Sequence, residues 1–342
     1  MKNKTIIITG GGTGGHLSIA KAFIDKFYSL NYKVIFIGSL KGQDRIWFED
    51  NQKIYKKYFL NTTGVVNQNF FGKIKALSLI LKAILQSANI IQKNRVSKII
   101  SVGGFSAAPA SFAAILLKKD FYIHEQNSIM GKLNKITSKF AKEVFSSYDT
   151  NSKVKDYPIN QEFFNYQRVK TEIKTIIFLG GSQGAVAINN FALKIAPKLI
   201  EKGIKIIHQT GKNDYKRVGE EYKKLNLKVD LFDFSTNIIE KISKADFAIS
   251  RSGASTLWEL VALGTPALFI PYPYAASNHQ YYNALFLAKK DLAFIQTEKE
   301  LNEEYFFDIL SNINIKDISY KLTQTIDKNG IDKIVDIIIE KQ

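Results

Sequence analysis

The sequence contains no cysteine, which excludes disulfide bonds, thiol catalysis and thiolate metal sites. Its longest weakly polar stretch, residues 107–117, is well short of the roughly 20 residues that a membrane-spanning helix needs. The apolar run that follows the basic residues at the start is too short for a signal peptide. Zinc-binding patterns and the aromatic signature of RNA-binding domains are missing as well. We therefore expect a cytoplasmic protein that binds no nucleic acid, with attachment to a membrane surface left open.

Basic charge is abundant where those features are missing. The 342 residues carry a formal net charge of +17, and 45% of them are hydrophobic. A chain of this length predicts two domains with ample buried cores. The charge favours anionic partners, such as a nucleotide substrate or an acidic membrane surface.

A glycine-rich loop organises the start of the chain. Residues 10–16 read Gly-Gly-Gly-Thr-Gly-Gly-His, between the apolar run 5–9 and helically spaced apolar residues from Leu17 onward. A strand, a glycine turn and a helix start mark the first unit of an open α/β sheet. The unpaired N–H groups of such a helix start favour an anion, for example a diphosphate. His16 is the only side chain of this loop that can transfer a proton near neutral pH.

Three other interpretations of the loop are weaker. Gly10, Gly12 and Gly15 satisfy the dinucleotide-binding pattern, but the next strand candidate, 33–37, closes with Gly38-Ser39 instead of the acid that holds a ribose. A nucleotide-hydrolase loop requires Gly-Lys followed by Ser or Thr, and this loop has Gly-His. A turn without a ligand does not require five glycines in six positions.

The loop recurs once. Residues 5–14 line up with residues 175–184, each copy being a strand, a glycine turn and the start of a helix. The repeat predicts an α/β protein of two doubly wound, Rossmann-like domains whose loops face a shared cleft. We place the domains at 1–155 and 156–342, with residues 150–174 as the crossover and the last helix returning to the first domain.

Further strand candidates alternate with helical stretches in both halves. They are residues 98–102, 121–124, 143–145, 227–234, 245–250 and 265–271, with one more strand ending at His208-Gln209. The helical stretch 72–93 mixes apolar residues with lysines. Phe70 and Phe71 at its start, near Lys73 and Lys75, fit either packing on the sheet or a lipid-facing patch rimmed by positive charge.

Polar clusters follow several of these strands. Residues 124–127 read His-Glu-Gln-Asn, and burying four such groups would leave donors unpaired, so we expect them to bind a polyhydroxyl ligand. A helix cap by Asn127 or Ser128 is compatible with that role. In the second half, Glu259 lies on an otherwise apolar helix, where its carboxylate can accept hydrogen bonds from two ribose hydroxyls.

Residues 180–184 also match Gly-x-Ser-x-Gly, the strand-to-helix elbow of serine hydrolases. That alternative requires an acid and then a histidine further along the chain. Asp246 and His279 occur in this order, so spacing alone leaves the alternative open. It does, however, leave the first domain without a role.

The motifs taken together resemble the MurG family of bacterial N-acetylglucosaminyltransferases. The matching segments are 11–16, 124–127, 180–184, 251–254 with Glu259, and Gln280 with Asn283-Ala284. The resemblance implies the GT-B fold and transfer of N-acetylglucosamine from its UDP donor to the 4-hydroxyl of lipid I, the undecaprenyl-linked muramyl-pentapeptide. The product is lipid II, the precursor of peptidoglycan for cell-wall growth and division. The resemblance further implies an inverting reaction and peripheral attachment to the cytoplasmic face of the inner membrane.

The resemblance also implies roles for individual residues. His16 is the expected catalytic base, and no metal or cofactor is expected, in line with the lack of an Asp-x-Asp pair. The remaining residues are expected to bind substrate. Thr13, Gly14 and Gly15 meet the donor diphosphate and sugar, Asn127 a sugar hydroxyl, Ser182 a phosphate and Ser235 the uracil; Ala254, Ser255, Thr256, Leu257, Trp258 and Glu259 form the nucleoside pocket, with Glu259 on the ribose; and Gln280 contacts the donor sugar or diphosphate.

Three positions depart from the family pattern. The family usually has Pro-Gly shortly after the histidine, where this chain reads Leu17-Ser18-Ile19-Ala20. Asn160 replaces a donor-contacting arginine, and Phe105 replaces a tyrosine. These departures concern the acceptor and phosphate contacts and not the reaction. Two other functions stay open. One is another UDP-sugar enzyme of the same fold, such as a UDP-N-acetylglucosamine 2-epimerase or a glycolipid transferase. The other is a binding module without catalysis.

Overall fold

The computed structural model describes residues 4–62, 70–181, 183–235 and 237–340, and for residues 70–76 it describes the backbone alone. The chain divides into two units, and each is described by itself. The first comprises Met1–Ile159 together with Asn329–Gln342, and the second comprises Asn160–Lys328.

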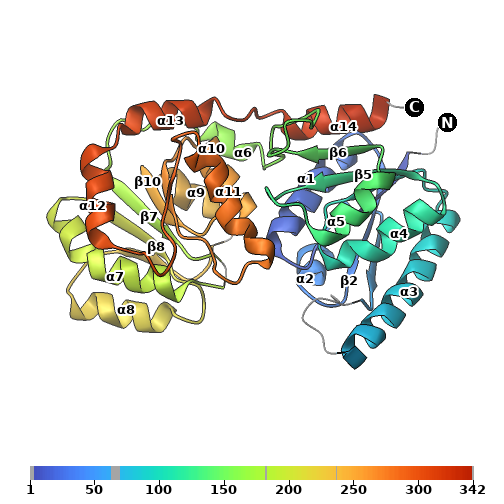
Figure 1. Ribbon diagram of the computed structural model, residues 1–342, viewed down its shortest axis with the longest axis horizontal. Helices are drawn as coiled ribbons and strands as arrows, with labels where there is room; N and C mark the ends of the chain where they lie inside the picture. The colour runs from blue at the N-terminus through green and yellow to red at the C-terminus, as the bar shows by residue number, and fades with distance from the viewer. Residues whose placement is uncertain (1–3, 63–69, 182, 236, 341–342) are drawn as a thin grey trace. The chain divides into compact units, whose positions relative to one another are not determined.

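The first unit is built on a six-stranded parallel sheet with the order β3-β2-β1-β4-β5-β6 (Figure 1). The strands are β1 (Thr5–Thr9), β2 (Lys33–Ser39), β3 (Lys56–Leu60), β4 (Lys98–Ser101), β5 (Asp120–Glu125) and β6 (Glu143–Ser146). This is the Rossmann order, in which the chain reverses direction across the sheet between β1 and β4. Ligands of such sheets bind at the carboxyl ends of the strands beside this reversal.

Helices cover the sheet because their apolar residues recur at helical spacing. The helices of this unit are α1 (Gly14–Ser29), α2 (Asp44–Phe48), α3 (Phe70–Lys93), α4 (Ala108–Leu116), α5 (Lys132–Thr137) and α14 (Gly330–Glu340). In α1 the residues Ala20, Phe23 and Phe27 are fully buried against the sheet. Helices α3 and α4 pack side by side (Figure 1).

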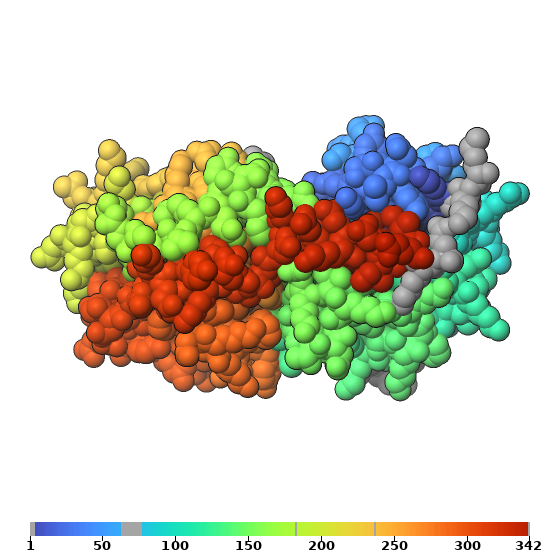
Figure 2. Space-filling model, turned by 90° about the horizontal axis from the view of Figure 1, so that it is seen from above, coloured from blue at the N-terminus to red at the C-terminus, as the bar shows by residue number. Residues whose placement is uncertain are grey.

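The last helix packs against the first unit. Helix α14 lies against α1, and Lys26 pairs with Asp332 at 2.7 Å (Figure 2). The buried Lys98 donates a hydrogen bond of 2.6 Å to the carbonyl of Ile338, which places a positive charge at the carboxyl end of the helix. Residues 329–340 are therefore part of the first unit although they follow the second in sequence.

The second unit repeats the architecture, with a parallel sheet in the order β12-β11-β10-β7-β8-β9. Its strands are β7 (Thr175–Leu179), β8 (Lys205–Gln209), β9 (Asp230–Phe232), β10 (Phe247–Ser250), β11 (Ala267–Phe269) and β12 (Phe294–Ile295). Its helices are α6 (Glu162–Asn165), α7 (Val186–Glu201), α8 (Tyr215–Lys224), α9 (Ile238–Ser243), α10 (Ala254–Ala262), α11 (His279–Ala288), α12 (Glu303–Asn312) and α13 (Ile315–Thr323). The repeated glycine loop follows β7, just as the first follows β1.

The α/β class with two doubly wound sheets is confirmed, and the structure adds elements that the sequence did not indicate. Sequence reasoning missed β3, β12 and α2 because β3 begins with two lysines, β12 has two residues and α2 has five. The strand expected at 227–234 was too long, since β9 spans only Asp230–Phe232. The crossover at 150–174, which shows no sustained period in sequence, contains the short helix α6.

Candidate functional site

The two glycine loops of the first unit lie backbone to backbone. The N–H of Gly11, in the loop after β1, donates to the carbonyl of Gly103, in the loop after β4, at 3.1 Å. A Cβ atom on Gly104 would come within 2.2 Å of the Gly11 carbonyl oxygen, and one on Gly10 within 2.5 Å of the Gly103 carbonyl oxygen. Only glycine fits at these positions, so the loops form one surface at the reversal point of the sheet.

A buried aspartate holds this surface in place. The carboxylate of Asp44 accepts hydrogen bonds from the N–H groups of Gly12 and, at 2.8 Å, Ser39. Burial raises the pKa of Asp44, and these hydrogen bonds partly offset that effect. An acid does follow the second strand, but it binds the glycine loop and cannot hold a ribose. Sequence reasoning missed Asp44, because a lone acid in a short polar segment belongs to no pattern.

His16 lies in the first turn of α1, beside both loops. Its Nδ1 atom is 2.9 Å from Oγ1 of Thr13, the exposed residue that precedes the helix. A Cβ atom on Gly103 would lie 3.5 Å from Nε2 of His16, so the imidazole packs against the second loop. Gly14 and Gly15 share this helical turn and are partly buried.

A second histidine is near His16 but is kept neutral. His124, at the end of β5, is buried against the rings of Phe23 and Tyr157. Burial first, and the charge of His16 second, lower the pKa of His124 to about 3. His124 therefore stays uncharged near neutral pH.

The carboxylate of Glu125 connects the polar cluster after β5 to these loops. Oε1 accepts the N–H of Asn127 at 3.0 Å, and Oε2 accepts the N–H of Gly131 at 2.9 Å and the amide of Asn134 at 2.8 Å. The Asn134 amide also lies 3.0 Å from the position of a Cβ atom on Gly103. The structure thus brings His16 and the partly buried Asn127 into one framework of the first unit. Asn134 was missed, although Glu125 stood in the polar cluster that signalled the site.

In the second unit the repeated glycine loop packs on the loop after β8. A Cβ atom on Gly184 would lie 2.3 Å from the carbonyl oxygen of Thr210, the same close approach that the first unit shows. Asn189 donates to that carbonyl at 3.1 Å and lies 3.0 Å from Nε2 of the buried His208. Ser182, the expected phosphate ligand, lies outside the described residues.

The start of α11 is tied to the loop before α10. Ser252 donates from Oγ to the carbonyl of Gln280 at 2.8 Å, and Asn283 donates to the carbonyl of Ser252 at 3.1 Å. The side-chain carbonyl of Gln280 accepts the N–H of Tyr272 at 3.0 Å. This bond fixes the side-chain oxygen of Gln280 on the backbone of the loop after β11.

The residues of α10 that are expected to form the nucleoside pocket differ in how deeply they are buried. Ala254, Leu257 and Trp258 are buried, so the latter two side chains support the helix from inside the unit. Ser255 and Thr256 are partly exposed, and Ser235, in the loop after β9, accepts the N–H of Asn237 at 3.1 Å. A contact of Leu257 or Trp258 with a nucleoside would have to use the backbone.

Glu259, on the same helix, has a carboxyl group with a raised pKa. Burial raises the pKa of its partly buried carboxyl group to about 7. Among the described residues no hydrogen-bond donor approaches this carboxylate. A carboxylate with unused acceptor positions on a helix near its start is suited to a ribose diol.

The serine-hydrolase alternative is excluded by the positions of its partners. Asp246 accepts the N–H groups of Lys174 and Thr175, both at 2.9 Å, at the amino end of β7. The Gly180–Gly184 loop follows the carboxyl end of the same strand. Nδ1 of His279 lies 2.8 Å from the carbonyl oxygen of Ala276. Asp246 therefore cannot support a triad at that loop.

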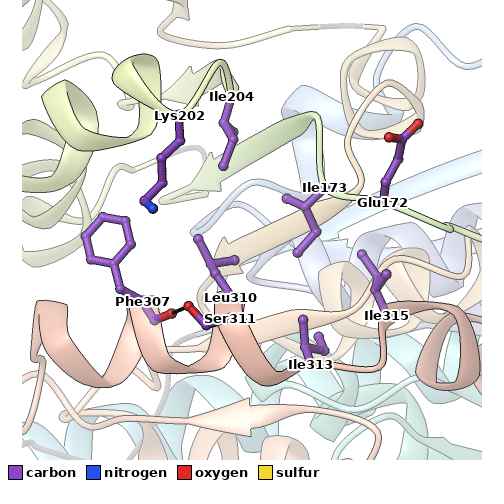
Figure 3. A pocket seen from close by; sticks show the side chains of 9 residues that line it. All are labelled: Glu172, Ile173, Lys202, Ile204, Phe307, Leu310, Ser311, Ile313 and Ile315. Atoms are coloured by element: carbon purple, nitrogen blue, oxygen red, sulfur yellow. Dashed lines mark hydrogen bonds between the residues drawn. The ribbon is translucent and has the colours of Figure 1, made fainter.

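The second unit has a cavity of about 310 Å³ at the amino ends of its strands, the end of the sheet opposite the glycine loop. It lies where β7 and β8 begin, beside α12, and apolar side chains line it together with Glu172, Lys202 and Ser311 (Figure 3). Ligands of doubly wound sheets bind at the carboxyl ends of the strands, so this cavity is not part of the site. Among the described residues, no cluster of three His, Asp or Glu side chains suits a metal ion.

Two Rossmann-like units, each with a glycine loop at the carboxyl ends of its strands, define the GT-B architecture of two-domain glycosyltransferases and related nucleotide-sugar enzymes. Residues 6–146 match the glycosyltransferase family 28 N-terminal domain, and residues 175–337 match the family 28 C-terminal domain. The chain belongs to this family and, within it, to the MurG enzymes, as its relatives show.

One relative, from Campylobacter jejuni subsp. doylei, is 48% identical over 98% of this chain and 97% of its own length. Another, from Helicobacter pylori, is 48% identical over 97% of this chain and 98% of its own. Both are named UDP-N-acetylglucosamine–N-acetylmuramyl-(pentapeptide) pyrophosphoryl-undecaprenol N-acetylglucosamine transferase. The crystal structure of Acinetobacter baumannii MurG matches 98% of this chain and 99% of its own, with 27% identity and a TM-score of 0.78. A UDP-N-acetylglucosamine 2-epimerase structure at 12% identity and a TM-score of 0.66 shares the fold alone.

Proposed function

We propose that the protein transfers N-acetylglucosamine from UDP-N-acetylglucosamine to the muramyl 4-hydroxyl of lipid I and so forms lipid II. One observation carries this proposal: relatives named for that transfer align with almost the whole chain. One of them is 48% identical over 98% of the chain. The site supports it, since the first unit holds a histidine at a glycine loop and the second holds a carboxylate suited to a ribose.

His16 is the proposed base. In the tautomer that can act as the base, Nδ1 carries the proton and faces Oγ1 of Thr13 at 2.9 Å, and Nε2 carries the lone pair. The acceptor oxygen attacks C1 of the donor sugar and loses its proton to Nε2. The bond between C1 and the diphosphate oxygen breaks, and UDP leaves with the electron pair. Attack opposite the leaving group turns the α-linked donor into a β-linked product.

The remaining side chains bind the substrates. We assign Thr13, Gly14, Gly15 and Ser182 to the diphosphate and sugar, Asn127 to a sugar hydroxyl and Gln280 to the donor. Glu259 accepts hydrogen bonds from the ribose hydroxyls, and Ser235 with the exposed part of α10 binds the uracil ring of UDP. Backbone N–H groups at the starts of α1 and α10 can stabilise charge on the leaving group without a metal.

The direct test is formation of lipid II from labelled UDP-N-acetylglucosamine and a lipid I analogue. Transfer of label to the acceptor is the expected result. Conversion of the donor in the absence of acceptor would indicate an epimerase instead. Tight binding of UDP without any turnover would indicate a binding module.

We further propose that the first unit attaches to the cytoplasmic face of an anionic membrane through α3. Leu77, Leu81 and Leu85 follow one another at intervals of four residues and are 52%, 63% and 73% exposed. Helix α3 contains four lysines and no acidic residue. An exposed apolar stripe on a basic helix suits the interface of a membrane with acidic lipids. Phe70 and Phe71, expected in such a patch, are among the residues whose side chains are not described. Among the described residues no helix is long and apolar enough to cross a bilayer.

Replacing Leu81 and Leu85 together by glutamate should weaken binding to vesicles that contain anionic phospholipid by at least about tenfold. The change removes apolar surface that the membrane would bury, and it adds two negative charges that the anionic lipids repel. Cosedimentation with vesicles measures the effect. Leu225→Glu is the matched control, since Leu225 is an exposed leucine of the second unit, and it should bind as the parent protein does. Equal binding of the double variant and the parent would refute the attachment through α3.

A further inference from the structure

Helix α2 presents a large apolar surface beside the glycine loop. Trp47 is 38% exposed and Ile46 is 84% exposed, although the helix has only five residues. Its inner positions, Asp44 and Phe48, are fully buried, so the helix is anchored from one side. Neither Trp47 nor its neighbour Gln43 has a role in the transfer described above.

The contacts of α2 place Trp47 over the first turn of α1. A Cβ atom on Gly14 would lie 3.7 Å from Cζ2 of Trp47 and 3.6 Å from Oε1 of Gln43. Gly14 is two residues before His16 in the same helical turn. The tryptophan ring and the glutamine amide therefore border the turn that carries the proposed base.

The position of α2 relative to the loop is fixed. Asp44, at the start of α2, accepts the N–H of Gly12, and a Cβ atom on Gly42 would lie 2.8 Å from the Cα atom of Gly12. The ring of Trp47 also packs edge-on against the buried Phe48, with 6.3 Å between centroids. An exposed aromatic ring that is held this firmly has little conformational freedom to lose when it binds a ligand.

We propose that Trp47 and Gln43 form a recognition surface for the acceptor, with the indole ring stacked on the apolar face of its amino-sugar ring. A pyranose presents C–H groups on one face and hydroxyl and amide groups around its edge. An aromatic face with a neighbouring amide matches both features. The inference rests on the proposed function, since it takes the acceptor of His16 to be a sugar hydroxyl.

The lipid tail of the acceptor is the competing occupant. A polyprenyl chain would contact any exposed apolar side chain of α2, and Ile46 is more exposed than Trp47. A sugar ring requires the flat face of Trp47 and gains nothing from Ile46. The proximity of Trp47, and not Ile46, to Gly14 favours the sugar.

Steady-state kinetics with a short-chain lipid I analogue test the surface. Trp47→Ala should raise the acceptor KM about tenfold, leave the donor KM unchanged and change kcat by less than about threefold. Trp47→Phe should restore most of the acceptor affinity, because it keeps an aromatic face. Ile46→Ser is the matched control and should match the parent protein. An unchanged acceptor KM in Trp47→Ala, with the enzyme active, would overturn the inference.

Fluorescence gives a second readout that does not depend on turnover. The chain has two tryptophans, and the other, Trp258, is buried. The short-chain acceptor analogue alone should change the emission of the parent protein and not that of Trp47→Phe. A signal without transfer would refute the proposed transfer reaction but not the binding of the acceptor sugar at Trp47. If Trp47→Ala weakens only a long-chain acceptor, the surface binds lipid and the inference fails.

Discussion

Replacing His16 by alanine is expected to lower kcat for lipid II formation by about 100- to 10,000-fold, the usual contribution of a positioned base. The donor KM should stay within about threefold of the parent value, because the imidazole acts on the acceptor hydroxyl. Radiolabelled donor and a lipid I analogue under single-turnover conditions measure the effect. The large loss reflects a direct role in the step that breaks and forms bonds.

Thr13→Val provides the comparison for this prediction. Thr13 Oγ1 lies 2.9 Å from Nδ1 of His16, and its loss removes the group that orients the ring without removing the base. We expect a smaller fall in kcat, of about 3- to 30-fold. Normal turnover by His16→Ala would show that another group is the base.

Replacing Glu259 by glutamine is expected to weaken UDP binding about 30- to 100-fold at pH 8. The neutral amide offers one uncharged oxygen where the carboxylate offers two charged ones, so its hydrogen bonds from the two ribose hydroxyls are weaker and cannot be made one to each oxygen. Because burial raises the pKa of Glu259 to about 7, the parent protein should also bind UDP less tightly as the pH falls below 7. Calorimetric titration with UDP between pH 5.5 and 8.5 compares the two proteins, and the pH dependence should be flatter in Glu259→Gln.

Although Glu259→Gln should weaken UDP binding, the same substitution should stabilise the ligand-free protein at alkaline pH. A glutamate side chain in the unfolded chain has its ordinary pKa of 4.5, whereas the pKa of Glu259 in the folded protein is about 7, so the folded state binds more protons between these values. Its contribution to stability is complete below pH 4.5 and is lost as the pH rises through 7. Glu259→Gln should therefore raise the Tm of the free protein by about 2–5 °C at pH 8 and leave it unchanged near pH 4. A lower Tm at pH 8 would show that the carboxylate is stabilised by the fold, contrary to its role as a vacant acceptor.

Much of the fold could be read from local pattern. The strand, glycine turn and helix at the start of the chain recur 170 residues later, and both copies are β–loop–α units at the reversal of a doubly wound sheet. Period and glycine content are properties of neighbouring residues, so they are visible in the sequence. The ligand role expected for the polar cluster 124–127 was wrong for His124, Glu125 and Gln126, which are buried, and the Glu125 carboxylate binds N–H groups of its own unit.

The roles of other residues depend on contacts between distant segments. Asp44 binds the N–H of Gly12, 32 residues away, and Lys98 binds the carbonyl of Ile338, 240 residues away. Neither belongs to a pattern, and either could equally have been a surface residue. The serine-hydrolase spacing of Asp246 and His279 was consistent in sequence and was excluded only by the end of β7 at which Asp246 lies.

The sequence by itself determined the two Rossmann-like sheets, the two glycine loops and the histidine beside the first, because hydrophobic period and glycine spacing act over a few residues. Tertiary structure alone decided which carboxylates serve the framework and which are left for a ligand. In the folded protein the carboxylates of Asp44 and Glu125 accept hydrogen bonds from backbone N–H groups, whereas Glu259 has no hydrogen-bond donor among the described residues. It also brought Trp47 over Gly14, since only folding sets how closely segments far apart in the chain approach each other.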